Sequence, residues 1–306
     1  MKDHVIRFRD RRVTVPAGRP MLMGIVNANP DSFSDTRRLT TLDAQVEHAL
    51  ALVDAGADLI DVGGESGVTY TGVTAEQVEI ERVVPLVERL VAEGVIVSVD
   101  TWKPAVARAV LDVGAHMLND VSGLRSPEFA DLCAQTGAAL VLMHTRAAPK
   151  EVHFADYGGA VAADVRSFLA DITRVARERG VADEQLVLDP GPDFAKTPAE
   201  TVACLHDLDA LHATGLPVLL AVSNKYFVGA ITGRAPGERL AGTLAAVGWS
   251  ADRGAAMLRV HDVRAARDLL DVKLVLDGHE PVPDFDADDD RLKWIRASAD
   301  DIAGDG

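Results

Sequence analysis

Hydrophobic and polar positions follow one arrangement that recurs along the chain. Short runs of apolar and β-branched residues alternate with longer segments in which apolar side chains recur at helical spacing. A Gly or a small polar residue ends most of the helical segments. The apolar runs lie at 21–27, 58–64, 95–100, 116–121, 139–145, 186–191, 217–223 and 256–263. The sequence therefore predicts eight consecutive strand–helix units.

Eight such units favour a closed (β/α)8 barrel. Strands that are apolar on both faces belong to parallel sheets covered by helices, and eight units over about 250 residues fit this fold. A doubly wound open sheet is the alternative, but it normally needs fewer units and often a Gly-rich first turn. No G-x-G-x-x-G follows the first predicted strand. We therefore predict an α/β protein of the TIM-barrel class.

The two ends of the chain fall outside the predicted barrel. Residues 1–20 alternate apolar and polar positions on either side of a D-R-R turn, which predicts a β-hairpin over the N-terminal mouth of the barrel. The barrel is expected to span 21–280 as a single domain. The tail, 281–306, is acidic and broken by prolines, so we expect it to be loosely ordered and anchored by Trp294 and Ile295.

Composition narrows the class of partner. The 306 residues carry a formal net charge of −16, whereas nucleic-acid binding needs a basic face. Cys133 and Cys204 lie in apolar helical segments and are expected to be buried thiols in a reducing compartment. The N-terminus shows no signal-peptide core, and no stretch reaches about 18 uninterrupted apolar residues. We expect a soluble, cytoplasmic protein with no nucleic-acid or membrane partner.

Polar side chains follow the predicted strands at their C-terminal ends, where barrels of this class build their active sites. Any single Asp or Asn there could cap the next helix, but capping does not require cations beside carboxylates. Carboxylates recognise a guanidine-like ring edge, an amide binds a ring carbonyl, and a guanidinium stacks on a ring or reaches a phosphate. We therefore expect a pocket for a polar, planar ligand with an anionic group. The candidates are Asn27, Asp61, Asp100, Asn119, Asp120, Met143, His144, Asp189, Ser223, Lys225, Arg259, His261 and Asp262.

Nine blocks of sequence between residues 21 and 263 resemble, in order, the signatures of the dihydropteroate synthase family. They include M-G-I-V-N-A-N-P-D-S-F-S-D (23–35), D-V-G-G-E-S (61–66), S-V-D-T (98–101), N-D-V-S-G (119–123), L-D-P-G-P-D-F-A-K-T (188–197), S-N-K-Y-F-V-G (223–229) and R-V-H-D-V (259–263). Members of this family join 6-hydroxymethyl-dihydropterin pyrophosphate to p-aminobenzoate and release pyrophosphate with Mg²⁺. The resemblance implies this transferase function in folate biosynthesis.

The resemblance also assigns roles to matching positions. The implied pterin ligands are Asp100, Asn119, Asp189, Lys225, Arg259 over the ring and Met143 beneath it. The implied catalytic set is Asn27 as the Mg²⁺ or pyrophosphate ligand, Lys225, and the pyrophosphate ligands Arg259 and His261. Further substrate contacts are expected from Asp61, Phe194 and Ser223. Because Mg²⁺ and cations stabilise a departing pyrophosphate, the attacking aniline needs no strong general base.

The chain departs from the family pattern around the outer part of this pocket. Asn224 stands where the family has an arginine, which removes a positive charge and a planar fork. Residues 66–72 read S-G-V-T-Y-T-G in place of S-T-R-P-G, Asn29 replaces a threonine, and Pro192-Asp193 replaces a small apolar pair. Each phosphate-facing arginine that is lost would remove about 2.7–4 kcal/mol of transition-state stabilisation.

These departures leave two interpretations open. The chain is either a synthase in which residues such as Arg37 or Arg38 restore the charge, or a pterin-binding paralogue without synthase activity or with a different acceptor. The S-N-K block and D-T-W at 100–102 are similar to actinobacterial second copies of the family. A corrinoid-dependent methyltransferase domain is a third alternative, but it would need no pyrophosphate ligands. Segment 242–251 is expected either to form a homodimer seam or to pack on the barrel.

Overall fold

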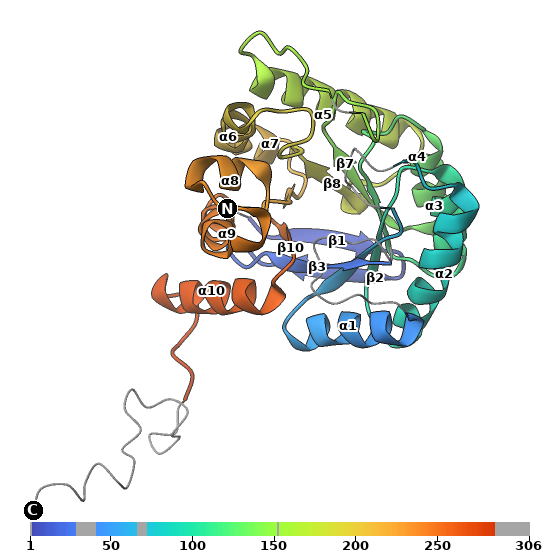
Figure 1. The fold of residues 1–306 in the computed structure, drawn as a ribbon, viewed down its shortest axis with the longest axis horizontal. Helices are drawn as coiled ribbons and strands as arrows, with labels where there is room; N and C mark the ends of the chain where they lie inside the picture. The colour runs from blue at the N-terminus through green and yellow to red at the C-terminus, as the bar shows by residue number, and fades with distance from the viewer. Residues whose placement is uncertain (1, 29–40, 66–71, 152, 285–306) are drawn as a thin grey trace, which may run out of the picture.

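The computed structural model describes residues 2–28, 41–65, 72–151 and 153–284. Within these residues, eight parallel strands run side by side in the order β8-β7-β6-β5-β4-β3-β10-β9. A parallel bridge between Leu188 and Val218 links the two ends of this sheet, and helices surround it (Figure 1). The strands are β3 (Met21–Asn27), β4 (Leu59–Gly63), β5 (Val97–Asp100), β6 (Met117–Asp120), β7 (Ala139–Met143), β8 (Leu186–Asp189), β9 (Leu219–Leu220) and β10 (Met257–Val260). The predicted barrel is confirmed.

The helices follow the strands as the spacing predicted, with two differences. They are α1 (Leu42–Asp54), α2 (Glu76–Ala92), α3 (Pro104–Asp112), α4 (Glu128–Thr136), α5 (Val161–Glu178), α6 (Pro198–His206), α7 (Leu208–His212), α8 (Tyr226–Thr232), α9 (Leu240–Asp252) and α10 (Val263–Leu276). Apolar residues recur at helical spacing throughout 199–215 and predict one helix there, but the structure divides it at Asp207, whose N–H donates to the Cys204 carbonyl and ends α6. Helix α8 begins at Tyr226, the residue after Lys225, where the sequence predicted no helix.

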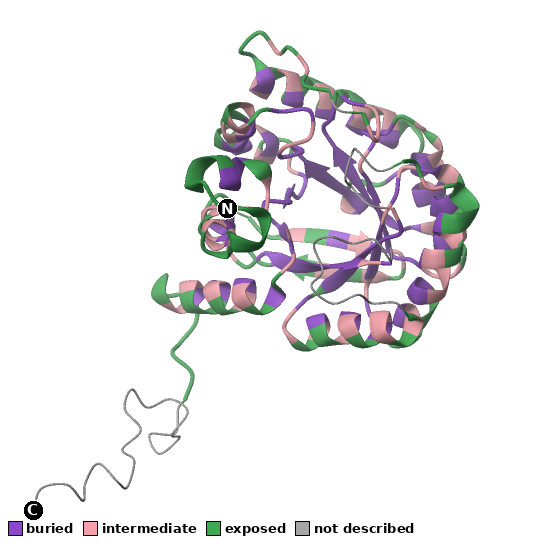
Figure 2. Cartoon of the chain, in the orientation of Figure 1, coloured by how far each residue is buried: buried purple, intermediate pink, exposed green. Residues whose placement is uncertain are grey.

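The barrel strands are buried on both faces (Figure 2). Successive side chains of β3 show why: Leu22 packs with the outer helices, whereas Met23 points to the barrel interior with Leu59 and Met117. Burial on both sides makes each strand a nearly continuous apolar run, so each run in the sequence marks where a strand lies.

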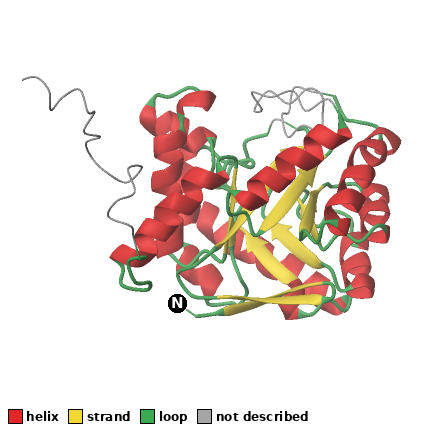
Figure 3. Ribbon diagram, turned by 90° about the horizontal axis from the view of Figure 1, so that it is seen from below, coloured by secondary structure: helices red, strands yellow, loops and turns green. Residues whose placement is uncertain are grey.

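A β-hairpin closes the N-terminal end of the barrel, as predicted (Figure 3). Strand β1 (His4–Phe8) pairs antiparallel with β2 (Arg11–Val15). The side chains of Ile6, Phe8 and Val15 are buried in the same cluster as the inward-pointing residues of the barrel strands. The hairpin is therefore a plug of apolar side chains rather than a loose appendage.

The remaining predictions concern the cysteines, membrane-spanning helices, the possible dimer seam and the ends of the chain. Cys133 and Cys204 are buried and carry no disulfide, as predicted. No helix among the described residues is long and apolar enough to cross a membrane. Helix α9 covers the segment considered for a dimer seam, and Thr243 and Val247 are among its side chains buried on the barrel; a homodimer stays a prediction. The domain boundaries also stay predictions, and the tail anchors Trp294 and Ile295 lie outside the described residues.

Candidate active site

The C-terminal ends of the strands bring the predicted site residues into one mouth. Neighbouring strands place them in register: Asn27 is opposite Gly63, Gly63 is opposite Asp100, and Asp100 is opposite Asn119. Met143 and Asp189 are likewise opposite one another on β7 and β8. Parallel strands that end at one edge thus convert positions far apart in sequence into a shared site.

Asp61 organises the floor of this mouth. Its carboxylate is fully buried and accepts hydrogen bonds from Ser98 Oγ at 2.7 Å, Asn119 Nδ2 at 3.1 Å and Arg259 Nε at 2.7 Å. Both oxygens are therefore occupied within the protein. The sequence predicted Asp61 as a substrate contact, whereas its contacts in the structure orient Asn119 and Arg259.

Asp100 is the carboxylate that faces the ligand space. Arg259 Nη2 donates to Asp100 Oδ2 at 3.0 Å, and about a quarter of the Asp100 side chain remains exposed. Burial raises the pKa of Asp100 to about 7, although the Arg259 guanidinium acts to lower it. Asp100 can therefore change its charge near neutral pH.

Lys225 lies across the mouth from this pair. Its Nζ sits 4.5 Å from the centre of the Phe194 ring, a cation–π arrangement. Burial lowers the pKa of the Lys225 ammonium, while Asp193 and Asp189 act to raise it. Asp189 is itself buried, and its Oδ1 accepts from the Gly191 N–H at 2.7 Å. Phe194 thus lines the mouth and contacts the lysine that was assigned to the pterin, while its role as a substrate contact stays a prediction.

Ser223 and His261 form a pair at the ends of the last two strands. Ser223 Oγ lies 2.9 Å from His261 Nδ1 and also accepts from the His261 N–H at 3.2 Å. Burial lowers the pKa of His261 to about 4, and the charges of Arg259 and Lys225 act in the same direction. The imidazole is therefore neutral at pH 7, so it can offer an anion a hydrogen bond but no charge.

Asn224 lies in a turn, and the backbone conformation of that turn favours an asparagine at this position. Its φ is +57, in the left-handed region that asparagine tolerates better than most residues. The Asn224 N–H donates to Thr243 Oγ1 at 3.0 Å, and its carbonyl accepts from Arg239 Nη1 at 2.9 Å. Arg239 also reaches the Lys225 carbonyl at 3.3 Å. Sequence reasoning missed Arg239, which holds the turn that presents Lys225.

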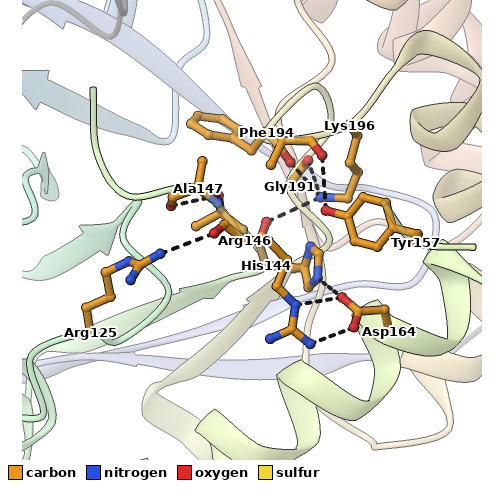
Figure 4. Close-up of polar contacts among 11 residues, drawn as sticks. Arg125, His144, Arg146, Ala147, Tyr157, Asp164, Gly191, Phe194 and Lys196 are labelled. Carbon is orange, nitrogen blue, oxygen red and sulfur yellow. Dashed lines mark hydrogen bonds and ion pairs between the residues drawn. The ribbon is translucent and has the colours of Figure 1, made fainter. Parts of the chain in front are cut away.

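A second residue that sequence reasoning left without a role is Lys196. Its buried Nζ donates to the backbone carbonyls of Gly191 at 2.9 Å, Phe194 at 3.1 Å and His144 at 3.3 Å (Figure 4). Burial lowers the pKa of Lys196 to about 8. The ammonium ties the turn after β8, which carries Phe194, to the turn after β7.

The turn after β7 is braced from the other side. His144 Nε2 lies 2.9 Å from Asp164 Oδ2, and Arg146 clamps the same carboxylate with two hydrogen bonds of 2.9 and 2.6 Å (Figure 4). Burial lowers the pKa of His144 to about 4, so the ring is neutral at pH 7. His144 is thus a structural residue, whereas the strand-end pattern had made it a site candidate. Asp262 caps α10 through the Ala265 N–H, the capping role that was the alternative for such residues.

A buried ion cluster lies at the ends of β4 and β5. Lys103 Nζ contacts both Glu65 Oε2, at 3.0 Å, and Glu79 Oε2. Trp102 Nε1 donates to Glu65 at 3.0 Å, and Thr101 Oγ1 donates to Glu79 at 2.8 Å. The cluster holds Glu65, the residue directly before 66–71, in place. Those residues, like Asn29, Arg37 and Arg38, lie outside the described part of the chain.

A cavity of about 420 Å³, called here the outer cavity, opens above these groups. Asp100, Phe194 and Lys225 line it, whereas Asn119, Asp189 and Met143 are buried and do not. Its wall is completed by side chains from the loops after β5, β7 and β9, among them Trp102, Thr145, Lys150, Phe154 and Tyr226. The site therefore has a deep polar part and an outer part with aromatic walls.

Comparison with known proteins agrees with this architecture. The family model described as pterin binding enzyme matches residues 23–261. The dihydropteroate synthase of Bacillus subtilis is 38% identical over 248 residues, which are 80% of this chain and 85% of that protein. A probable bifunctional folylpolyglutamate synthase/dihydropteroate synthase of Haloferax volcanii is 40% identical over 88% of this chain, which spans 32% of the longer protein. The structure of Xanthomonas albilineans dihydropteroate synthase with 4-aminobenzoic acid superimposes with a TM-score of 0.82 at 40% identity, covering 92% of this chain and 100% of that one.

The chain therefore belongs to the pterin-binding enzyme family. Within that family it belongs with the dihydropteroate synthases, since its relatives at about 40% identity carry that name and the same fold. The family resemblance found in the sequence is confirmed. The similarity to actinobacterial second copies stays a prediction.

Proposed function

We propose that this protein is a transferase that joins the pterin methylene of 6-hydroxymethyl-dihydropterin pyrophosphate to the amino group of p-aminobenzoate, with pyrophosphate as the leaving group. The observation that carries the proposal is the deep polar part of the site. Asp100, Asn119, Asp189 and Lys225 reach one mouth from four different strand ends and offer acceptors and donors to a flat heterocycle.

Each of these groups has a chemical role toward a pterin. The carboxylates of Asp189 and Asp100 accept from the amino-pyrimidine edge, and the Asn119 amide, oriented by Asp61, pairs with a ring carbonyl or nitrogen. Lys225 donates to a ring acceptor. Met143, which is almost fully buried, is assigned to the lower face of the ring.

The pyrophosphate is assigned to the groups at the ends of β3 and β10. Arg259 contributes charge, and the neutral His261 and its partner Ser223 contribute hydrogen bonds. No cluster of three or more acidic, histidine or cysteine residues that could hold a metal occurs in the described part of the chain. The half-buried amide of Asn27 suits Mg²⁺ that arrives with the substrate, because this ion takes few protein ligands besides phosphate oxygens and water. Bound there, Mg²⁺ would neutralise the departing pyrophosphate.

The outer cavity is assigned to p-aminobenzoate. At about 420 Å³ it is within the range of small-molecule sites. Phe194 lines this cavity, and an aromatic ring there offers a face for stacking the benzoate ring.

The deciding experiment measures pyrophosphate release from 6-hydroxymethyl-dihydropterin pyrophosphate by the purified protein with Mg²⁺, with and without p-aminobenzoate. Release that requires p-aminobenzoate, at about 1 s⁻¹ or faster, supports the synthase. If the pterin binds and no pyrophosphate is released with any arylamine, the proposal is wrong and the chain is a pterin-binding paralogue.

A further inference from the structure

The outer cavity carries a cation that the pterin site does not use. Among the described residues, the lysines and arginines on its lining are Lys150, Lys196 and Lys225. Lys196 directs its ammonium at three backbone carbonyls, and Lys225 sits over Phe194 on the pterin side. Lys150 is the remaining lysine, and it lies on the loop between β7 and α5.

The electrostatics of this cavity make such a cation necessary for an anionic ligand. The carboxylates on its described lining are Glu65, Glu79, Asp100, Glu151 and Asp193. Like charges at short range disfavour one another, so a benzoate would be repelled unless a positive group meets its carboxylate. The arginine expected at position 224 is absent, because asparagine stands there.

Lys150 is held on the cavity wall rather than in solvent. Its side chain is only 11% exposed, and its Nζ lies 3.9 Å from Glu65 Oε1. Glu65 is already hydrogen-bonded by the Thr74 N–H at 2.6 Å and by Trp102 and Lys103, each at 3.0 Å. Glu65 therefore attracts Lys150 by charge at a distance longer than a hydrogen bond, and its own contacts do not depend on that lysine.

The neighbours of Lys150 favour an aromatic anion. Trp102, Phe154 and Tyr226 line the same cavity, and Phe154 and Tyr226 are each 58% exposed. Exposed aromatic side chains around a cavity gain burial when a flat ring enters. A benzoate ring among these side chains with its carboxylate toward Lys150 would satisfy both kinds of group.

We propose that Lys150 binds the carboxylate of the acceptor and so supplies positive charge on the acceptor side of the outer cavity. This inference rests on the proposed function, because it concerns the acceptor of that reaction. Burial lowers the pKa of Lys150, and a ligand carboxylate beside the ammonium would oppose that effect. Lys150 is then the residue that makes the site prefer anionic over neutral arylamines.

The test combines a variant with a neutral acceptor. Lys150→Met keeps the length of the side chain and removes its charge, and p-aminobenzamide keeps the arylamine and removes the carboxylate. We expect Lys150→Met to raise KM for p-aminobenzoate about tenfold or more, the usual effect of losing a charged hydrogen bond. KM for p-aminobenzamide should be unchanged, and Lys150→Arg should keep most of the preference for p-aminobenzoate.

Two results would overturn the inference without touching the proposed function: an unchanged KM for p-aminobenzoate, or an equal rise for both acceptors. No pyrophosphate release by the unaltered protein with either acceptor would overturn the proposed function and this inference together. Thermal unfolding of both variants provides the folding control, and Glu65 keeps its hydrogen bonds from Thr74, Trp102 and Lys103 in each of them.

Discussion

Replacing Gly191 with alanine should force apart the turns that follow β7 and β8. A Cβ at Gly191 would lie 2.1 Å from the carbonyl oxygen of His144, far inside ordinary contact, and Gly191 has a φ of +66. The same carbonyl accepts from Lys196, so it cannot move without disturbing a buried ammonium. The change therefore tests whether these turns act as one unit.

The magnitude follows from three costs. An alanine in the left-handed region costs about 1–2 kcal/mol. Displacing a backbone carbonyl resembles overpacking, at about 1–3 kcal/mol, and weakening a hydrogen bond from a buried charge adds about 1.5–3 kcal/mol. Gly233→Ala is a matched control, because Gly233 has a φ of +69 and a Cβ there would meet nothing within 4 Å. Only the first cost applies to it.

The assay is urea unfolding of both variants, followed by circular dichroism and extrapolated to water. We expect Gly191→Ala to lose at least about 2 kcal/mol more of unfolding free energy than Gly233→Ala. Pterin binding should weaken in Gly191→Ala, since the Gly191 N–H holds the carboxylate of Asp189, and stay normal in Gly233→Ala. Equal losses of stability in the two variants would refute the reasoning, because the contact with His144 would then have no cost.

The remaining predictions concern charge. Burial raises the pKa of Asp100 to about 7, and an ionised carboxylate accepts hydrogen bonds from the ring more strongly than the protonated acid. Pterin affinity should therefore fall as the pH drops below 7, and calorimetry should find this dependence absent in Asp100→Asn. Lys103→Met removes the cation that contacts both Glu65 and Glu79 and should cost about 3–5 kcal/mol in urea unfolding, whereas a loss under 1 kcal/mol would contradict a buried ion cluster. Burial lowers the pKa of His144 from 6.5 to about 4 on folding. The neutral ring therefore contributes up to about 3 kcal/mol to the free energy of unfolding above pH 6.5, and this contribution is lost as the pH falls to 4. His144→Gln should flatten that part of the dependence of stability on pH.

The fold could be predicted because a strand that is buried on both faces appears in the sequence as a nearly continuous apolar run. The runs that begin at 21 and 139 became β3 and β7 with little change. The short helix α8 could not be predicted, since its seven residues make only two turns, too few to establish a helical spacing of apolar positions. The break at Asp207 was missed because apolar spacing continues through it into α7.

The site was predictable as a set of strand ends but not as a set of contacts. Arg259 and Asp61 are 198 residues apart, and nothing local to either residue indicates that their side chains meet. Lys196 was visible as a family match, yet its three carbonyl partners depend on backbone turns that only the folded chain defines. Residue types at strand ends therefore predict which chemistry is present, whereas the partners of each group come from the structure.

The hairpin at the N-terminal end has a kinetic consequence. Because Ile6 and Phe8 fill that end, ligands enter and leave the barrel through the opposite mouth alone. The buried groups assigned to the pterin lie behind the outer cavity, so an arylamine bound first would obstruct the way in. The two substrates should then bind in a compulsory order, with the pterin pyrophosphate first. The condensation product of pterin and arylamine should inhibit competitively against the pterin pyrophosphate but not against the arylamine.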